Sequence, residues 1–258
     1  MRRAIALAVV ATVLLVATAA RAEAPRHTLA VAAAANLKTA AVELKKGFEA
    51  EHPDTEVTLT LGASGTFFAQ LQNGAPFDLF LSADREYPQK AVAAGLAKAE
   101  DEKVYAFGKL VAWLPPGSTL PLERDGLKAL LDPSVKHVAI ANPAVAPFGR
   151  AAAAALQAAG VADVVRPKLV LGTSASQAAQ FATTGAADVA FLPMSLALGQ
   201  ELAGGRVVPV PEGLYPRIEQ AGLVLSAARE PALAQAFLAF VLGEKGRAIL
   251  ARSGYGLP

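Results

Sequence analysis

From residue 27 onward, short apolar runs alternate with helical patterns, and little else separates them. The first apolar runs predict strands at 28–33, 56–61 and 77–84. Between the first two, Ala41, Leu44 and Phe48 fall on one face of a helix. This alternation predicts an α/β protein in which helices cross over between parallel strands.

The alternation begins again after a long apolar run at 104–114, which stops at Pro115 and Pro116. We interpret this run as a strand that crosses between two lobes, and 207–210 as the strand that crosses back. The second half adds expected strands at 137–141, 168–171, 188–192 and 221–226, and closing helices at 231–242 and 244–252. We therefore expect two lobes, one at 23–107 plus 214–258 and the other at 108–213, with two crossing strands as the hinge.

The N-terminal residues are typical of an export signal. Basic residues Arg2 and Arg3 precede an apolar run at 4–20, and small residues follow around Ala22. The run is shorter than the ~20 apolar residues that span a bilayer. We expect residues 1–22 to be cleaved near Ala22 and the protein to be periplasmic. Removing them takes away three Arg and no acidic residue, so the formal net charge falls from +2 to −1.

Composition excludes several classes of function. There is no Cys, which rules out disulfides, thiolate metal sites and a lipoprotein anchor. Basic and acidic residues are interleaved, so we expect no nucleic-acid surface. The three His residues are isolated, and there is neither a nucleophile elbow nor a phosphate loop with its Lys. We expect no enzyme, no cofactor and no site that ligates a metal cation.

Candidate ligand-binding residues follow the expected strands. Asn36 follows Ala35 after the first strand, and Ser64 stands with Thr66 after the second. The helices expected in the second half begin near Phe148 and near Ala175, the latter after Thr173 and Ser174. In open α/β sheets, ligands bind beyond the carboxyl ends of the strands. A helix N-terminus offers unpaired N–H groups and a partial positive charge, so these ends predict a cleft that binds an anion.

Purely structural roles for these residues compete with the interpretation as an anion-binding cleft. Ser, Thr and Asn are common helix caps, and we expect capping or a hydrogen bond at the cleft rim for Asp78 and Asp84. Core packing is expected for Phe67 and Phe68, and solvent exposure for Arg150. Five or six hydrogen bonds of ~1.5–3 kcal/mol each to a charged group would still suffice for tight capture of an anion without a basic side chain.

Several motifs, in their order and spacing, resemble the periplasmic molybdate-binding proteins of ABC transporters. They are VAAAANL at 31–37, GASGT at 62–66, NGAPFDLFLSAD at 73–84, NP at 142–143, APFG at 146–149, SQAA at 176–179 and TGAADV at 184–189. The resemblance covers the chain from residue 27 to its end, and the segment 74–84 is its most specific part.

The resemblance implies a two-lobed periplasmic-binding fold of the second class that holds a dehydrated tetrahedral oxyanion. Molybdenum or tungsten would be bound only within molybdate or tungstate, and a monomer would deliver the anion to an ABC permease. By position, Ser64 would supply its hydroxyl and N–H, beside Asn36 and Ala35, and Phe148 and Ala175 would supply main-chain N–H groups. Family members usually add a Tyr hydroxyl, which is absent here, with Thr66, Thr173 or Ser174 as weaker replacements.

Two other functions remain open on sequence. The protein could bind another anion, such as sulfate, chromate or a small organic anion gripped by Arg150. It could also be an exported hydrolase for phosphoesters or acyl groups with Ser64 as its nucleophile, although no base accompanies this residue.

Overall fold

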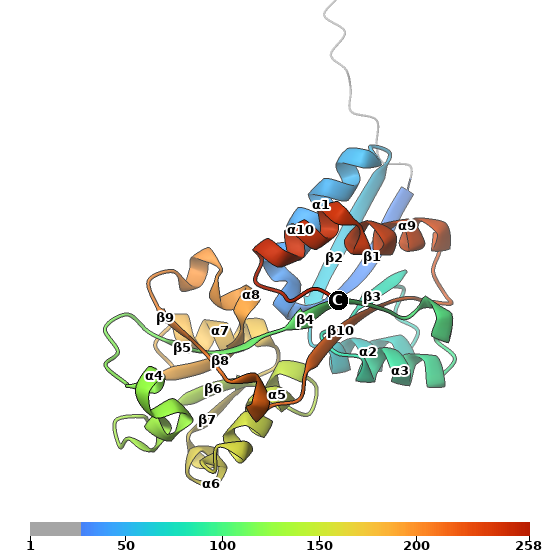
Figure 1. Ribbon diagram of the computed structural model, residues 1–258. Coiled ribbons are helices and arrows are strands. Elements are labelled where there is room, and N and C mark those ends of the chain that lie inside the picture. Colours follow the sequence, from blue (N-terminus) through green and yellow to red (C-terminus); the bar gives the residue numbers. More distant parts are fainter. Residues whose placement is uncertain (1–26) are drawn as a thin grey trace, which may run out of the picture.

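The computed structural model describes residues 27–258, which form two lobes, each built on a five-stranded sheet (Figure 1). The expected export signal at 1–22 lies outside the described residues. The first sheet has the order β2 (Thr55–Gly62), β1 (His27–Ala34), β3 (Leu79–Leu81), β10 (Ile218–Val224) and β4 (Lys103–Gly108). The second has the order β7 (Leu169–Gly172), β6 (Val138–Ala141), β8 (Val189–Pro193), β5 (Leu110–Leu114) and β9 (Arg206–Pro209).

Each sheet is parallel on one side and antiparallel on the other. Strand β1 runs parallel to β2 and β3, and β6 runs parallel to β7 and β8. Strand β10 is antiparallel to β3 and β4, and β5 is antiparallel to β8 and β9. The antiparallel strands are those next to the crossings between lobes. Strands β10 and β5 each arrive from the other lobe and run against the direction of their neighbours in the sheet. Both sheets are therefore mixed, whereas the alternation of strands and helices predicted parallel ones.

Helices cover both faces of the two sheets. The first lobe carries α1 (Lys38–Glu51), α2 (Ser64–Gln72), α3 (Glu86–Ala93), α9 (Pro231–Leu242) and α10 (Glu244–Arg252). The second carries α4 (Leu122–Asp125), α5 (Pro147–Ala158), α6 (Ala162–Val165), α7 (Ala175–Thr183) and α8 (Met194–Ala197). Ala41, Leu44 and Phe48 are all buried, as their spacing predicted, in one core cluster with residues of the sheet, α9 and α10. Among residues 27–258, no helix combines the length and apolar character of a membrane span.

The two crossings differ from the expected ones. The apolar run at 104–114 divides at Lys109, with β4 in the first sheet and β5 in the second. Strand β9 pairs with β5, so the expectation that 207–210 crosses back is wrong, and the chain returns between Pro209 and Ile218. An apolar run does not specify its partners, which is why the pattern could not place this crossing.

The hinge is closely packed at Gly108, where β4 ends. A Cβ atom there would lie 2.6 Å from Cζ of Phe148 and 2.8 Å from Nε2 of Gln220. Phe148 belongs to the second lobe and Gln220 to the first, so both lobes meet at this glycine. Any side chain at this position would displace one of them.

Asp78 has a structural role. It is 2% exposed, and its two carboxylate oxygens accept hydrogen bonds from the backbone N–H groups of Ala30 and Arg229, each at 2.7 Å. These bonds tie β1 to the segment before α9. The carboxylate therefore binds backbone N–H groups of β1 and of the segment before α9, and the expectation of a helix cap or a bond at the cleft rim is wrong for this residue.

We predict that Asp78→Ala lowers the free energy of unfolding by about 3 kcal/mol, because two buried N–H groups lose a charged acceptor. Asp78→Asn keeps one acceptor oxygen and should lose less. Urea unfolding monitored by circular dichroism measures both variants. An alanine variant with the unfolding midpoint of the wild type would contradict the assigned role.

Candidate functional site

Three helices begin around one small pocket between the lobes. It contains about 220 Å³ of empty space, counting the part that opens to solvent. Helix α2 contributes its first turn from one lobe, while α5 and α7 contribute theirs from the other, and the short helix η1 (Ala35–Leu37) completes the wall. The lining residues are Ala34, Ala35, Asn36, Gly62, Ala63, Ser64, Ala83, Ala146, Pro147, Phe148 and Ala175.

Backbone donors face this pocket without partners. The first N–H groups of a helix have no acceptor within the helix. Within residues 27–258, the N–H groups of Ser64, Phe148 and Ala175 have no acceptor. The partial positive charge of each helix N-terminus adds to these donors. The pocket therefore attracts a negatively charged group, and it does so from both lobes at once.

The side chains of the pocket are neutral. Ser64 is 1% exposed, and its Oγ accepts a hydrogen bond of 3.0 Å from the N–H of Ala83. Its own proton is then available to a ligand. Asn36 is the other polar side chain of the lining, which contains no charged residue. A site of this kind holds an ionised ligand by hydrogen bonds rather than by an ion pair.

The structure brings five of the predicted residues together, namely Ala35, Asn36, Ser64, Phe148 and Ala175. It does not bring the three weaker candidates into the pocket. Thr66 is exposed and lines a separate depression beside Asn73. Thr173 is exposed, and Ser174 caps α7 by accepting a hydrogen bond from the N–H of Gln177. None of these three hydroxyls takes the place of the family's tyrosine.

Sequence reasoning missed the residues that support Asn36. Gln220 and Tyr255 both accept hydrogen bonds from its Nδ2, at 2.8 Å and 3.0 Å. Ser195 of α8 donates to its carbonyl oxygen at 2.9 Å, and Tyr255 donates to the same oxygen at 2.8 Å. These residues lie at least 159 positions from Asn36 along the chain, so no local pattern connects them to it.

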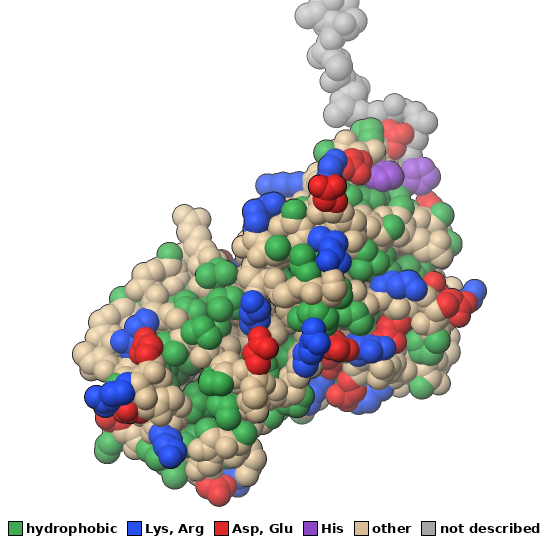
Figure 2. Space-filling model, in the orientation of Figure 1, with side chains coloured by type: hydrophobic (Ala, Val, Ile, Leu, Met, Phe, Trp, Pro, Cys, Tyr) green, Lys and Arg blue, Asp and Glu red, His purple; other side chains and the backbone are tan. Residues whose placement is uncertain are grey.

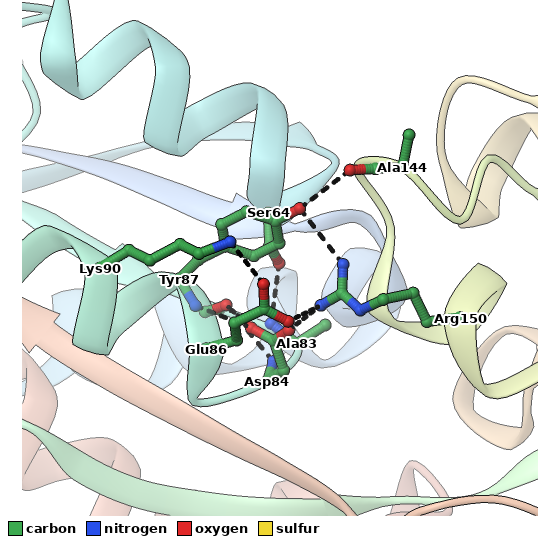
Figure 3. A network of polar contacts seen from close by, with 9 residues as sticks. Ser64, Ala83, Asp84, Glu86, Tyr87, Lys90, Ala144 and Arg150 are labelled. Atoms are coloured by element: carbon green, nitrogen blue, oxygen red, sulfur yellow. Dashed lines mark hydrogen bonds and ion pairs between the residues drawn. The ribbon is translucent and has the colours of Figure 1, made fainter.

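Arg150 links the two lobes beside the pocket, as Figure 3 shows. This residue of α5 pairs with the carboxylates of Asp84 and Glu86 in the first lobe, the second at 3.1 Å. Its Nη1 also donates to the hydroxyl of Tyr87 at 3.2 Å, and that hydroxyl donates to the carbonyl of Ala144 in the second lobe. The side chain of Arg150 is 32% exposed, so the expectation that it is simply solvated is wrong.

The carboxyl of Asp84 accepts hydrogen bonds from the N–H of Tyr87 in the first turn of α3, at 3.3 Å, and from the hydroxyl of Ser82, at 3.0 Å, in line with the expected capping. Its side chain is only 14% exposed. Burial raises the pKa of Asp84 above its ordinary value, and the Arg150 guanidinium offsets only part of the rise. The closed lobes therefore bind a proton on Asp84 more tightly than an open form in which the carboxyl is hydrated. Arg150 therefore offsets the free-energy cost of burying ionised Asp84. Without Arg150, this cost would oppose closure of the lobes.

Comparison with known proteins identifies the family to which this chain belongs. The model of the family described as bacterial extracellular solute-binding protein matches residues 29–256. The molybdate-binding protein ModA of Rhodobacter capsulatus is 42% identical over 224 residues, which cover 87% of this chain and 86% of that protein. The ModA protein of Azotobacter vinelandii is 37% identical, with 88% of this chain and 89% of that protein covered. The chain belongs to the ModA family of bacterial extracellular solute-binding proteins.

The fold of this solute-binding protein agrees with its family. The solved periplasmic molybdate-binding protein of Azotobacter vinelandii superimposes with a TM-score of 0.82 at 32% identity, over 89% of this chain and 99% of that one. In the present family member, the ring of Phe148 reaches Gly108 at the hinge while its backbone lines the pocket. The position therefore contributes a main-chain donor and a hinge contact.

We predict that Arg150→Gln weakens ligand affinity about tenfold at pH 7, because it leaves Asp84 ionised and unpaired when the lobes close; the partial exposure of the pair limits the effect. Asp84→Asn should stay close to the wild type. The pKa of Asp84 in the closed form is raised, so its proton is taken up as pH falls through that raised value, and the defect of Arg150→Gln should shrink as pH is lowered.

Isothermal titration of both single variants and of the double variant between pH 5 and 7 measures these effects. Combining Asp84→Asn with Arg150→Gln should restore part of the lost affinity. If Asp84→Asn alone lost as much affinity as Arg150→Gln, the attraction within the pair, and not relief of a buried charge, would stabilise the closed lobes.

Proposed function

We propose that this protein captures molybdate, and tungstate with it, outside the cytoplasmic membrane and delivers the anion to an ABC permease. The observation that carries the proposal is a pocket that combines free backbone N–H groups from three helices with the hydroxyl of Ser64 and no charged side chain. The names of the ModA relatives support molybdate as the ligand.

The donor set favours an anion that carries no proton. A ligand hydroxyl would need an acceptor in the pocket, and the backbone groups that face it at the helix N-termini are donors. Molybdate and tungstate are alike in charge and close in size, so neutral donors do not separate them. Sulfate is smaller and would not reach the donors of both lobes at once. We therefore expect its affinity to be lower than that of molybdate.

We propose cleavage of the export signal near Ala22, a periplasmic location and a monomeric binding protein without a cofactor. On the face shown in Figure 2, basic and acidic side chains are interspersed, which fits a protein that does not bind nucleic acid. Organic anions gripped by Arg150 are disfavoured because Asp84 and Glu86 already occupy its guanidinium.

Calorimetric titration of the mature protein with molybdate, tungstate, sulfate and phosphate tests the proposal. We expect heat and tight binding with the first two anions, and much weaker binding with the last two. The absence of binding to every oxyanion would refute it.

We predict that Ser64→Ala weakens molybdate affinity by ~1.5–3 kcal/mol, roughly ten- to a hundredfold, through loss of one hydrogen bond to a charged ligand. Ser253→Ala, whose hydroxyl bonds the carbonyl of Ile249 away from the pocket, is the matched control. Unchanged affinity in Ser64→Ala would show that this hydroxyl does not contact the ligand. Turnover of a chromogenic ester that disappears in the same variant would instead support the hydrolase alternative.

A further inference from the structure

The last residues of the chain run along the hinge between the lobes. After α10 ends at Arg252, the chain turns, and its C-terminal end lies beside β4 and β10 (Figure 1). The N–H of Phe107 donates to the carbonyl of Gly256 at 2.8 Å, and the N–H of Gly256 donates to the carbonyl of Phe107 at 2.9 Å. Because Phe107 directly precedes Gly108, this pair of bonds attaches the C-terminal segment, residues 254–256, to β4 at the point where the chain crosses.

The C-terminal segment packs against the second lobe at Gly254. The φ angle of this residue is +86°, which favours glycine. A Cβ atom here would lie 2.9 Å from both Cδ1 of Leu198 and Cγ of Met194, so the contact leaves no room for a methyl group. Met194 begins α8, and its N–H donates to the carbonyl of Lys109 at 2.8 Å. Rotation of the second lobe about the crossing must therefore move α8 relative to the C-terminal segment.

Between these two contacts, Tyr255 reaches the pocket wall. It is 5% exposed, and its hydroxyl donates to the main-chain carbonyl oxygen of Asn36 at 2.8 Å. The same oxygen accepts a bond of 2.9 Å from the hydroxyl of Ser195 in α8. Since a carbonyl oxygen has two lone pairs, these two donors use both of them. One carbonyl of the pocket wall is thus held jointly by the C-terminal segment and by the second lobe.

We infer that the C-terminal segment is a third element of the hinge, which couples movement of α8 to the position of Asn36, with Tyr255 as the positioning residue. The inference rests on the proposed function for its ligand and adds to it a connection between closure and the pocket wall. Opening withdraws Ser195 from the Asn36 carbonyl and relieves the contact of α8 with Gly254, and closure restores both. The C-terminal segment therefore contributes to affinity although it does not line the pocket.

Gly254→Ala tests the contact with the second lobe, and Gly95→Ala is its matched control. Both glycines have a positive φ, +86° and +74°, so an added methyl group strains both backbones. At Gly95 a Cβ atom meets nothing within 4 Å, whereas at Gly254 it meets α8. We expect both variants to lose thermal stability, and only Gly254→Ala to lose molybdate affinity, about three- to tenfold in isothermal titration. Equal affinities in the two variants would overturn the inference.

Rates separate this effect from a distorted pocket. The chain has no Cys, so dyes on Glu56→Cys and Gln157→Cys, which are exposed positions in different lobes, can report closure by energy transfer. Stopped-flow mixing with molybdate measures association, and mixing the loaded protein with excess unlabelled wild type measures release. The added methyl of Gly254→Ala clashes only when the lobes are closed, so release should be faster and association within about twofold of wild type. Slower association with unchanged release would overturn the inference.

Tyr255→Phe and Ser195→Ala test the shared carbonyl. Each variant alone leaves one donor on the Asn36 oxygen, and the double variant leaves none. Molybdate affinity should therefore fall about threefold in each single variant, and in the double variant by more than the product of the two losses. A loss equal to that product would overturn the coupling.

These variants also serve if Gly254→Ala does not fold, which thermal unfolding establishes. Failure of the proposed function looks different from all of these results. The wild type itself would then bind no oxyanion, and the inference would be overturned with it.

Discussion

Backbone N–H groups that have no acceptor are the constraint around which this protein is built. Helices α2, α5 and α7 begin at the same small space, and the N–H groups of Ser64, Phe148 and Ala175 there have no acceptor in the described chain. Buried donors of this kind are costly unless something accepts from them. An anion that accepted from these donors in both lobes would favour the closed arrangement. This explains why the lining needs no basic side chain, since the positive field comes from the backbone itself.

The contacts between the lobes follow from the same constraint. If an anion alone held the lobes together, its release would require all of its hydrogen bonds to the pocket to break at once. Arg150 and Ser195 instead add interlobe contacts that do not use the unpaired N–H groups of the pocket: Arg150 pairs with Asp84, and Ser195 donates to the carbonyl of Asn36. The N–H of Gly65 adds a direct bond of 2.9 Å to the carbonyl of Val145 across the cleft. The anion and the lobes thus stabilise the same closed state through separate sets of atoms.

The sequence predicted the parts of this arrangement that are local. Alternating apolar runs indicated the lobes, and small or hydroxyl-bearing residues after the strands indicated Asn36 and Ser64. The roles of Arg150, Gln220 and Tyr255 escaped because each acts through a partner that is distant in the chain. The sequence does not show that the other lobe covers Arg150, so an Arg on a helix is expected to be solvated. Tyr255 lies three residues from the end of the chain and belongs to no periodic pattern. The return crossing was misplaced for a similar reason, because β9 is defined by its pairing with β5.

Phe148 has a consequence for how long a ligand stays bound. Its N–H is one of the pocket donors, while its ring packs against Gly108, where the chain passes between the lobes. Rotation about the hinge must therefore move this donor, and opening cannot begin without disturbing the ring. The side chain at this position is thus one contributor to the barrier to opening, and through it to the residence time of the ligand. Related proteins with a different ring here could hold the same anion in the same pocket and still release it at a different rate.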